Sequence, residues 1–331
     1  MNEPVTARVD PFGLAFGQGR SAEVLRRLDL AVNRRLDGIL QGDYRGLVPG
    51  HGSELGETRR YQAGDDVRRI DWNVTARTTE PHVRETIADR ELETWVLLDR
   101  SPSLDFGTAD YLKRDLAVVA LAATGFLTAR TGNRFGAVFT GRTPLPEIVP
   151  ARGGRVALLA LLHRALAEPT PAVQPGRRRR TERVDPVGPT TLGPALERLA
   201  AVHRRTGLAV VVSDFLATDD WQRPLTRLAA RPETLADEIV DPRELELPSV
   251  GVLTLVDPET GRRRDVQTSS ARLRERYAEA AREQRAGIAG AIRRSGADHL
   301  VLRTDRDWLI DLVRFVALRR ARTAGLPRRA R

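Results

Sequence analysis

From residue 93 onward, two hydrophobic patterns alternate along the chain. Short apolar runs predict buried strands, and longer segments in which apolar residues recur every three or four positions predict amphipathic helices. The predicted strands are 95–98, 135–140, 147–149, 208–213, 235–240 and 299–302, and the predicted helices are 109–130, 155–167, 193–206, 221–230, 270–294 and 306–322. Such alternation is typical of an α/β fold, in which a mostly parallel sheet is flanked by helices on both faces.

The chain before residue 93 has a different pattern. Residues 1–20 are polar and contain glycine and proline, which predicts a flexible N-terminus. Between Ser21 and Leu40 apolar residues return at helical spacing, which predicts a helix capped by Ser21. Glycines then interrupt residues 42–92 repeatedly and helical periodicity is absent, so short strands and turns are expected there. We therefore predict that residues 21–92 form a helix followed by a small β-rich subdomain.

The α/β domain is predicted to span residues 93–322, followed by a basic tail over 323–331. Residues 169–189 are rich in proline and include a run of four arginines, so they are expected to form an exposed loop. Residues 241–268 are predicted to form a hairpin insertion, because two strand-like runs flank the turn sequence Asp-Pro-Glu-Thr-Gly.

Oxygen-bearing side chains follow the predicted strands at their carboxyl ends. Asp99, Ser101 and Ser103 come directly after one apolar run, and Asp214 follows another. Thr190 stands in a turn that opens the helix predicted over 193–206. If both strands belong to one parallel sheet, these side chains meet in one crevice, which is where open α/β sheets bind ligands.

Carboxylate and hydroxyl oxygens suit Mg²⁺ or Mn²⁺ better than softer metals. The chain has no cysteine, which excludes disulfides and thiolate metal sites. An Asp-x-Ser-x-Ser sequence by itself also fits a solvated loop that caps a helix. Three separate segments directed at one crevice favour a shared cation site.

A second landmark is the charged block over residues 56–90, in which Tyr61, Ile70 and Trp72 are interspersed with charges. One interpretation is a surface hairpin with weak compensating ion pairs. The other is a polar network that docks this subdomain near the cation crevice. Aspartates of this block at positions 65, 66 and 71 are weaker candidates for metal ligands.

The charge of the chain, +10 over 331 residues, raises the question of nucleic-acid binding. Lys113 is its single lysine among 54 basic residues, the arginines are scattered, and aromatic residues make up 5% of the chain. We therefore expect no nucleic-acid partner. No signal peptide and no apolar run long enough to span a membrane are present, so a soluble, cytoplasmic protein is expected.

The two landmarks together resemble the DUF58 family, whose members are similar to von Willebrand factor type A domains. The resemblance runs from about residue 21 to 320. Its most specific part comprises Arg60, Tyr61, Gly64, Asp65, Asp66, Arg68, Asp71, Trp72 and Arg77. The other matching segments are Leu98-Asp99-x-Ser101-x-Ser103 and Val212-Ser213-Asp214-Phe215.

The resemblance implies a von Willebrand A-like fold with a metal-ion-dependent adhesion site (MIDAS) that holds Mg²⁺ or Mn²⁺. Asp99, Ser101, Ser103 and Asp214 would match the family's ligands, together with Thr190. Many relatives carry aspartate directly after that threonine, whereas this chain has a second threonine at position 191, so either threonine could be the ligand.

The resemblance also implies a partner, because the family is commonly encoded beside MoxR-type AAA ATPases. The expected role is that of a non-catalytic adaptor or chaperone-like partner of such an ATPase. Hydroxyl ligands add no formal charge, so a cation held largely by serine and threonine stays electrophilic, and an acidic residue of the partner could complete its coordination. The aspartates would hold waters or orient the hydroxyls.

An enzyme is the alternative class, and a metal-dependent hydrolase of phosphoesters is its best form. It would use Asp99 as nucleophile or ligand and Asp214 as a ligand. The residue beside Asp99 is Arg100, which cannot act as a general acid or base at working pH. The chain also lacks Gly-x-Ser-x-Gly, His-Glu-x-x-His and P-loop motifs. The interaction module is therefore the favoured prediction.

Overall fold

The computed structural model describes most of the chain from residue 92 onward and part of the segment before it. The described residues are 58–62, 67, 70–78, 80–84, 92–129, 133–141, 145–167, 192–204, 207–217, 221–230, 233–258 and 262–324. The helix predicted over 21–40, the loop predicted over 169–189 and the two candidate ligands Thr190 and Thr191 lie outside them. The chain divides into two compact units, one comprising Pro49–Glu91 and the other the remaining residues.

The smaller unit contains an antiparallel pair of short strands, β1 (Thr58–Arg60) and β2 (His82–Arg84). It also contains the helix α2 (Trp72–Thr78), which is absent from the sequence prediction. The expectation of strands and turns alone was therefore wrong here. The helix starts from a local cap, because the Asp71 carboxylate accepts the backbone N–H groups of Asn73 (3.1 Å) and Val74 (3.3 Å). It buries no described residue, so no apolar periodicity marks it.

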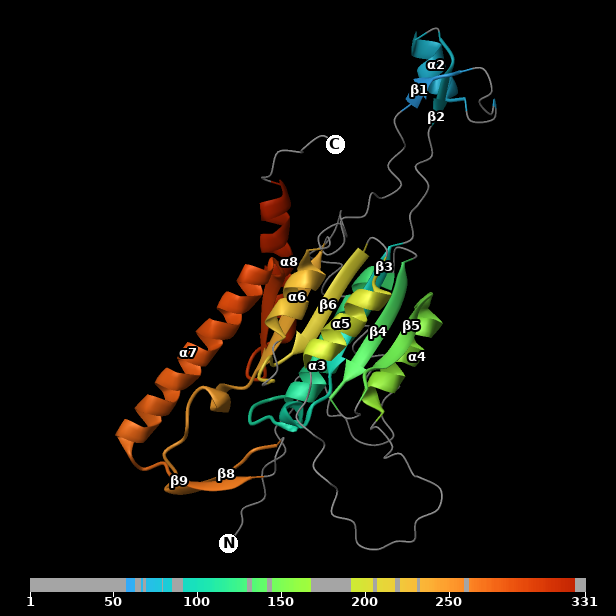
Figure 1. Cartoon of the computed structure of the whole chain (residues 1–331). Coiled ribbons are helices and arrows are strands. Elements are labelled where there is room, and N and C mark those ends of the chain that lie inside the picture. Colours follow the sequence, from blue (N-terminus) through green and yellow to red (C-terminus); the bar gives the residue numbers. More distant parts are fainter. Residues whose placement is uncertain are drawn as a thin grey trace, which may run out of the picture. The chain divides into compact units, whose positions relative to one another are not determined.

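The larger unit is built on a six-stranded sheet (Figure 1). Its strands lie in the order β10 (Asp298–Arg303), β7 (Thr234–Val240), β6 (Gly207–Ser213), β3 (Glu93–Asp99), β4 (Arg134–Thr140) and β5 (Glu147–Gly153). All neighbouring strands run parallel except the edge pair β4–β5. This confirms the prediction of a mostly parallel sheet.

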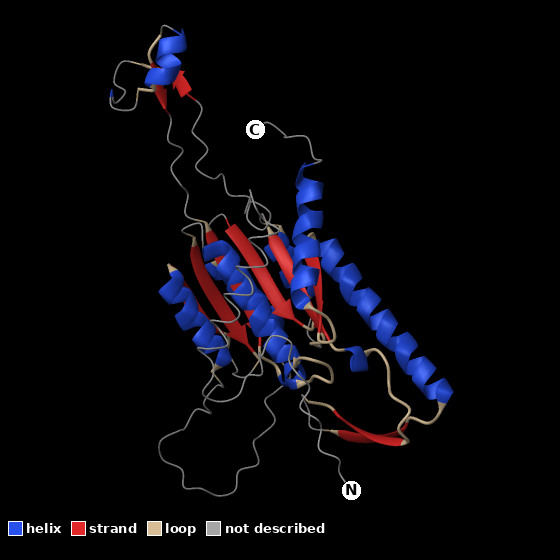
Figure 2. Ribbon diagram, turned by 180° about the vertical axis from the view of Figure 1, so that it is seen from behind, coloured by secondary structure: helices blue, strands red, loops and turns tan. Residues whose placement is uncertain are grey.

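Helices cover both faces of this sheet, as expected for the von Willebrand A-like fold (Figures 1 and 2). One layer consists of α3 (Lys113–Ala129), α4 (Arg155–Leu166) and α8 (Trp308–Ala324), and the other of α5 (Leu192–Val202), α6 (Gln222–Ala229) and α7 (Ala271–Ser295). Along β3, Val96 and Leu98 pack against the first layer, whereas Trp95 and Leu97 pack against the second. Burial on both faces explains why residues 95–98 of β3 form an uninterrupted apolar run instead of an alternating one.

The order of the strands creates a switch point between β3 and β6. The chain passes from β3 outward through β4 to β5 and then returns to the other side of β3 to form β6, β7 and β10. Consecutive connections thus leave the carboxyl ends of β3 and β6 in opposite directions, which opens a crevice between them. The oxygen-bearing residues identified in the sequence lie at these two strand ends.

A two-stranded hairpin, β8 (Val252–Val256) paired with β9 (Arg263–Gln267), is inserted before α7 and confirms the predicted insertion. The predicted helix 193–206 is shorter than expected, because α5 ends at Val202 and the chain needs the following residues to reach the start of β6. No helix in the described part of the chain is long and apolar enough to cross a membrane.

Candidate cation site at the switch point

The loop after β3 brings three of the predicted residues together. The Asp99 carboxylate accepts the backbone N–H of Ser101 at 2.9 Å, which folds the chain back on itself. The hydroxyls of Ser101 and Ser103 then lie 2.9 Å apart. Asp99 and Ser101 are buried, at 3% and 2% exposure. The short 3-10 helix η3 (Pro102–Asp105) follows directly and holds the second hydroxyl in place.

The loop after β6 meets the first loop through Ser213, whose hydroxyl donates to the other carboxylate oxygen of Asp99 at 2.7 Å. The next residue, Asp214, is 1% exposed and accepts the backbone N–H of Leu216 at 3.0 Å. Phe215, which lies between Asp214 and Leu216, adopts a left-handed backbone conformation with φ of 56°, which non-glycine residues rarely do. Its ring is buried beside Trp221, with centroids 5.0 Å apart. That packing holds the strained turn which presents Asp214.

The predicted convergence of Asp99 and Asp214 is therefore present in the structure. Burial, and after it the charge of Asp214, raise the pKa of the Asp99 carboxyl to about 7, although hydrogen bonds from Ser213 and Ser101 oppose the rise. The described residues give Asp99 hydrogen-bond donors but no cationic side chain.

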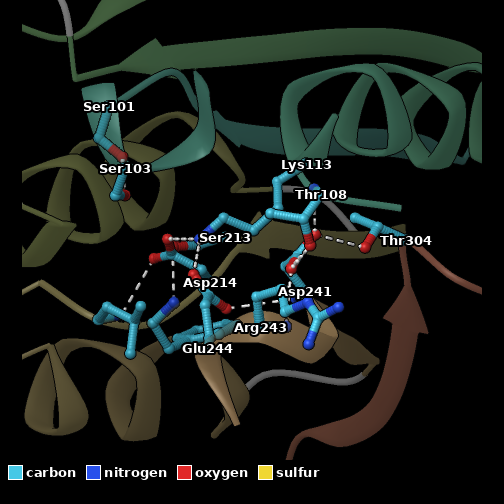
Figure 3. A network of polar contacts seen from close by, with 12 residues as sticks. Ser101, Ser103, Thr108, Lys113, Ser213, Asp214, Asp241, Arg243, Glu244 and Thr304 are labelled. Atoms are coloured by element: carbon cyan, nitrogen blue, oxygen red, sulfur yellow. Dashed lines mark hydrogen bonds and ion pairs between the residues drawn. The ribbon is translucent and has the colours of Figure 1, made fainter. Parts of the chain in front are cut away.

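Lys113 is the residue that the sequence interpretation missed. It is the first residue of α3 and is 0% exposed. Its ammonium group donates to Asp214 at 2.8 Å and also contacts Glu244 in the 3-10 helix η4 (Pro242–Glu244) (Figure 3). Burial alone would lower the pKa of Lys113, but the two carboxylates outweigh it and the pKa is raised, so the side chain stays charged. Its status as the single lysine among 54 basic residues was the available signal.

Charges of alternating sign continue from this lysine along the edge of the sheet. Glu244 also accepts from Arg285 of α7 at 3.0 Å, and Arg285 contacts Glu238 of β7. Glu238 in turn lies 2.8 Å from the imidazole of His299 in β10. The switch point is thus connected by ion pairs to α7 and β7, and through the contact between Glu238 and His299 to β10.

A second polar cluster closes the end of β7 and joins the first at Glu244, which accepts the backbone N–H of Asp241 at 3.3 Å. The Asp241 carboxylate accepts from the backbone N–H (2.8 Å) and hydroxyl (2.6 Å) of Thr108, from the hydroxyl of Thr304 (2.8 Å) and from the backbone N–H of Arg243 (2.9 Å) (Figure 3). Burial raises the pKa of Asp241, but these donors outweigh it and the pKa is lowered. The cluster ties the loop before α3 to β7 and β10, and so supports the helix that carries Lys113.

The family-specific block lies in the smaller unit, and the structure describes part of it. Asp71 serves as the cap of α2 and Arg60 forms an exposed ion pair with Glu80 at 2.9 Å. Trp72 is 70% exposed and Arg77 is exposed on the same helix. The motif residues Gly64, Asp65, Asp66 and Arg68 lie outside the described residues. The docking role predicted for this block stays a prediction.

The donors at the switch point fit a hard divalent cation. Two hydroxyls lie side by side, next to a buried carboxylate that has no cationic partner among the described residues. No group of three or more histidine, aspartate or glutamate side chains that could hold a metal occurs in the part of the chain that is described. Hydroxyls and water would therefore have to supply most of the ligands, as in the site expected from the sequence. Ser101 and Ser103 are the candidate direct ligands.

Comparison with known proteins gives matches over most of the chain. The family model described as "Protein of unknown function DUF58" matches residues 57–287. Uncharacterized protein Rv1480 of Mycobacterium tuberculosis and Uncharacterized protein Mb1516 of Mycobacterium bovis are each 51% identical over 300 residues, which is 90% of this chain and 90% of theirs. Both relatives are similar to this chain over nearly its whole length.

Two solved structures from Bacteroides are similar at lower levels. The conserved hypothetical protein BatB from Bacteroides thetaiotaomicron gives a TM-score of 0.39 at 13% identity, covering 70% of this chain and 99% of that one. An aerotolerance-related membrane protein from Bacteroides fragilis gives 0.38 at 12% identity, covering 70% and 97%.

Proposed function

Because this chain belongs to the DUF58 family, we propose that it is a non-catalytic protein-interaction module whose contact with its partner depends on a divalent cation bound at the switch point. The observation that carries the proposal is the meeting of two separate loops, in which Ser213 after β6 donates to Asp99 after β3 at 2.7 Å beside the paired hydroxyls of Ser101 and Ser103. The cation would be Mg²⁺ or Mn²⁺, since the donors are oxygens.

The serine hydroxyls would bind the cation directly, and Asp99 would orient them and neutralise part of its charge. Thr190 or Thr191 would join them, as the family resemblance implies. Neutral ligands leave the cation electrophilic, so a carboxylate of the partner could complete its coordination. The proposed partner is a MoxR-type AAA ATPase, which rests on the resemblance alone.

A direct binding measurement tests the cation site. Mn²⁺ binding is followed by electron paramagnetic resonance in the wild-type protein and in Ser103→Ala, with Ser269→Ala, an exposed serine next to α7, as the matched control. Loss of Mn²⁺ binding in Ser103→Ala but not in Ser269→Ala is expected. Equal binding by all three proteins contradicts the proposed site.

A pull-down with a co-encoded MoxR-type ATPase, with and without chelator, tests the partner. Retention of the ATPase only when Mg²⁺ is present, and its loss with Asp99→Ala, is expected. Retention in chelator would exclude a contact bridged by the cation. The same samples are assayed for Mg²⁺- or Mn²⁺-dependent phosphoester hydrolysis, since turnover that disappears in Asp214→Ala would favour the hydrolase.

A further inference from the structure

Lys113 stands where a positive charge is intrinsically unfavourable. It is the first residue of α3, and the N-terminus of a helix favours anions. It is also completely buried, and a buried ammonium is costly unless carboxylates accompany it. In the described part of the chain, its contacts with Asp214, 2.8 Å away, and with Glu244 offset both costs. The position of the lysine is thus set by these two carboxylates.

The same contacts occupy the oxygens of Asp214. One oxygen accepts from Lys113 and the other accepts the backbone N–H of Leu216 at 3.0 Å. Each oxygen keeps a further lone pair, but a divalent cation bound to Asp214 would lie close to the Lys113 ammonium, which repels it. Asp99 differs, because its donors are Ser101 and Ser213 and none of them is charged.

Glu244 differs from Asp214 in having a second cationic partner, because it belongs to the chain of ion pairs that continues from Lys113. Its second oxygen accepts from Arg285, which also contacts Glu238. Removing Lys113 would leave Asp214 buried without a counter-charge, whereas Glu244 would keep Arg285.

We propose that Lys113 is a built-in counter-cation that keeps Asp214 away from the divalent cation, so that the cation is held on the Asp99 side and retains positive charge for an anionic group of the partner. This inference rests on the proposed function and specifies how its site is regulated. With Asp214 neutralised by the lysine, Asp99 is the carboxylate that the described residues leave without a cationic partner beside the two serine hydroxyls. A divalent cation there keeps a net charge of about +1, which attracts a carboxylate.

Removal of the Lys113 ammonium should strengthen cation binding, although Lys113 is a residue of the site. In Lys113→Met the carboxylate of Asp214 is freed and can ligate the cation, so Mn²⁺ affinity should rise by about tenfold, because charged ligands tighten such sites. The bound Mn²⁺ should also lose coordinated water, measured by water proton relaxation. Partner retention in the pull-down should fall, since the extra carboxylate neutralises the cation.

Three further variants complete the experiment, with each protein first shown to be folded by circular dichroism and a cooperative thermal transition. Lys113→Arg keeps the positive charge and should bind Mn²⁺ like the wild type. Lys113→Met combined with Asp214→Asn should return the affinity to the wild-type value. Asp214→Asn alone should leave Mn²⁺ bound. It also covers the case in which Lys113→Met does not fold, because loss of Mn²⁺ in Asp214→Asn overturns the inference.

The outcomes separate this inference from the function on which it rests. If the wild-type protein binds no Mn²⁺, the proposed cation site and this inference both fail. If it binds Mn²⁺ but folded Lys113→Met binds no more tightly, the inference alone is overturned.

Discussion

At the scale of single residues, Asp237 in β7 and Asp241 directly after this strand differ in the hydrogen bonds that their carboxyl groups receive. Asp241 receives four hydrogen bonds, and its pKa is lowered. Asp237, four positions earlier, pairs in register with Val212 and Leu300, and its Oδ1 has no hydrogen-bond partner among the described residues. Burial raises the pKa of Asp237 to about 8. The environment of Asp241 therefore favours its charged form, whereas the environment of Asp237 favours its neutral form.

This difference predicts how stability depends on pH. Because the pKa of Asp237 is raised from 3.8 to about 8 in the folded state, its contribution to stability is fully present below pH 4 and is lost as the pH rises towards 8. In Asp237→Asn the group cannot ionise, so the decline in the free energy of unfolding between pH 4 and 8 should be smaller than in the wild type. Urea unfolding across this pH range measures it. Parallel profiles for the two proteins would show that Asp237 is not buried as described.

Gly141 is a second residue whose effect can be isolated. It follows β4 with φ of 106°, and a Cβ there would lie 2.3 Å from the backbone nitrogen of Ser101. Gly154 also has a positive φ, 88°, but a Cβ there meets nothing within 4 Å. Gly154→Ala should therefore cost about 1–3 kcal/mol through backbone conformation alone. Gly141→Ala should cost more and should also weaken Mn²⁺ binding, because the Ser101 loop must move. Equal losses of stability, with Mn²⁺ binding unchanged, would contradict this.

At the scale of elements, the β8–β9 hairpin depends on its base. A two-stranded hairpin is marginal in water, and the exposed Val252 and Val256 add little to its stability. The buried hydroxyl of Thr268 accepts the backbone N–H of Val250 at 3.1 Å and donates to the carbonyl of Gly251 at 2.8 Å. That clamp joins the two strands where they leave the body of the fold.

Replacing Thr268 by valine keeps the shape and removes the clamp. Because the Val250 N–H is then left without its acceptor, local opening of the hairpin should become easier by about 1–3 kcal/mol. Hydrogen exchange followed by mass spectrometry should show faster exchange over 252–267, with the central sheet unchanged. The control is Thr254→Val, whose hydroxyl contacts Asp265 at 2.6 Å on the exposed face. Similar acceleration in both variants would rule out a special role for the clamp.

The elements themselves were largely predictable from the sequence, and the reason is visible in β3 and β6. Every residue of these strands is buried, and residues 95–98 and 208–212 within them appear as uninterrupted apolar runs with a definite end. The polar residues directly after such a run mark the ligand edge of the sheet, which is why Asp99 and Asp214 could be paired in advance. Helix α2 could not be predicted in this way, because it depends on the cap at Asp71 and buries nothing.

The ion-pair partners of Lys113 could not be predicted from the sequence. Lys113 lies 101 positions from Asp214 and 131 from Glu244, and nothing local indicates that it turns inward. A lysine at the start of a helix usually reaches solvent. Only the packed arrangement of α3 against the strand ends makes it part of the site.

At the scale of the whole molecule, the net charge of +10 does not indicate the local charge at the candidate cation site. The ion pairs that involve Lys113 and Arg285 lie inside the fold, where salt screens them little. The charge that matters at the switch point is local and negative, in a chain that is basic overall. This is why cation binding is compatible with such a composition.

The tryptophan side chains of the two units also differ in how much of their surface is exposed. Trp95, Trp221 and Trp308 of the larger unit are 1–5% exposed, whereas Trp72 of the smaller unit is 70% exposed. Among the described residues of the smaller unit only Val83 and Asp71 are buried.

Tryptophan fluorescence can therefore be assigned to one unit. In Trp72→Phe the emission that acrylamide quenches readily should largely disappear and the remaining spectrum should shift to shorter wavelength, since the other three rings are shielded from solvent. The matched substitution Trp221→Phe removes a buried ring that packs on Phe215 and should leave the quenchable component in place. If Trp72→Phe instead removes a shielded component, that ring is covered in solution, which contradicts its 70% exposure in the structure.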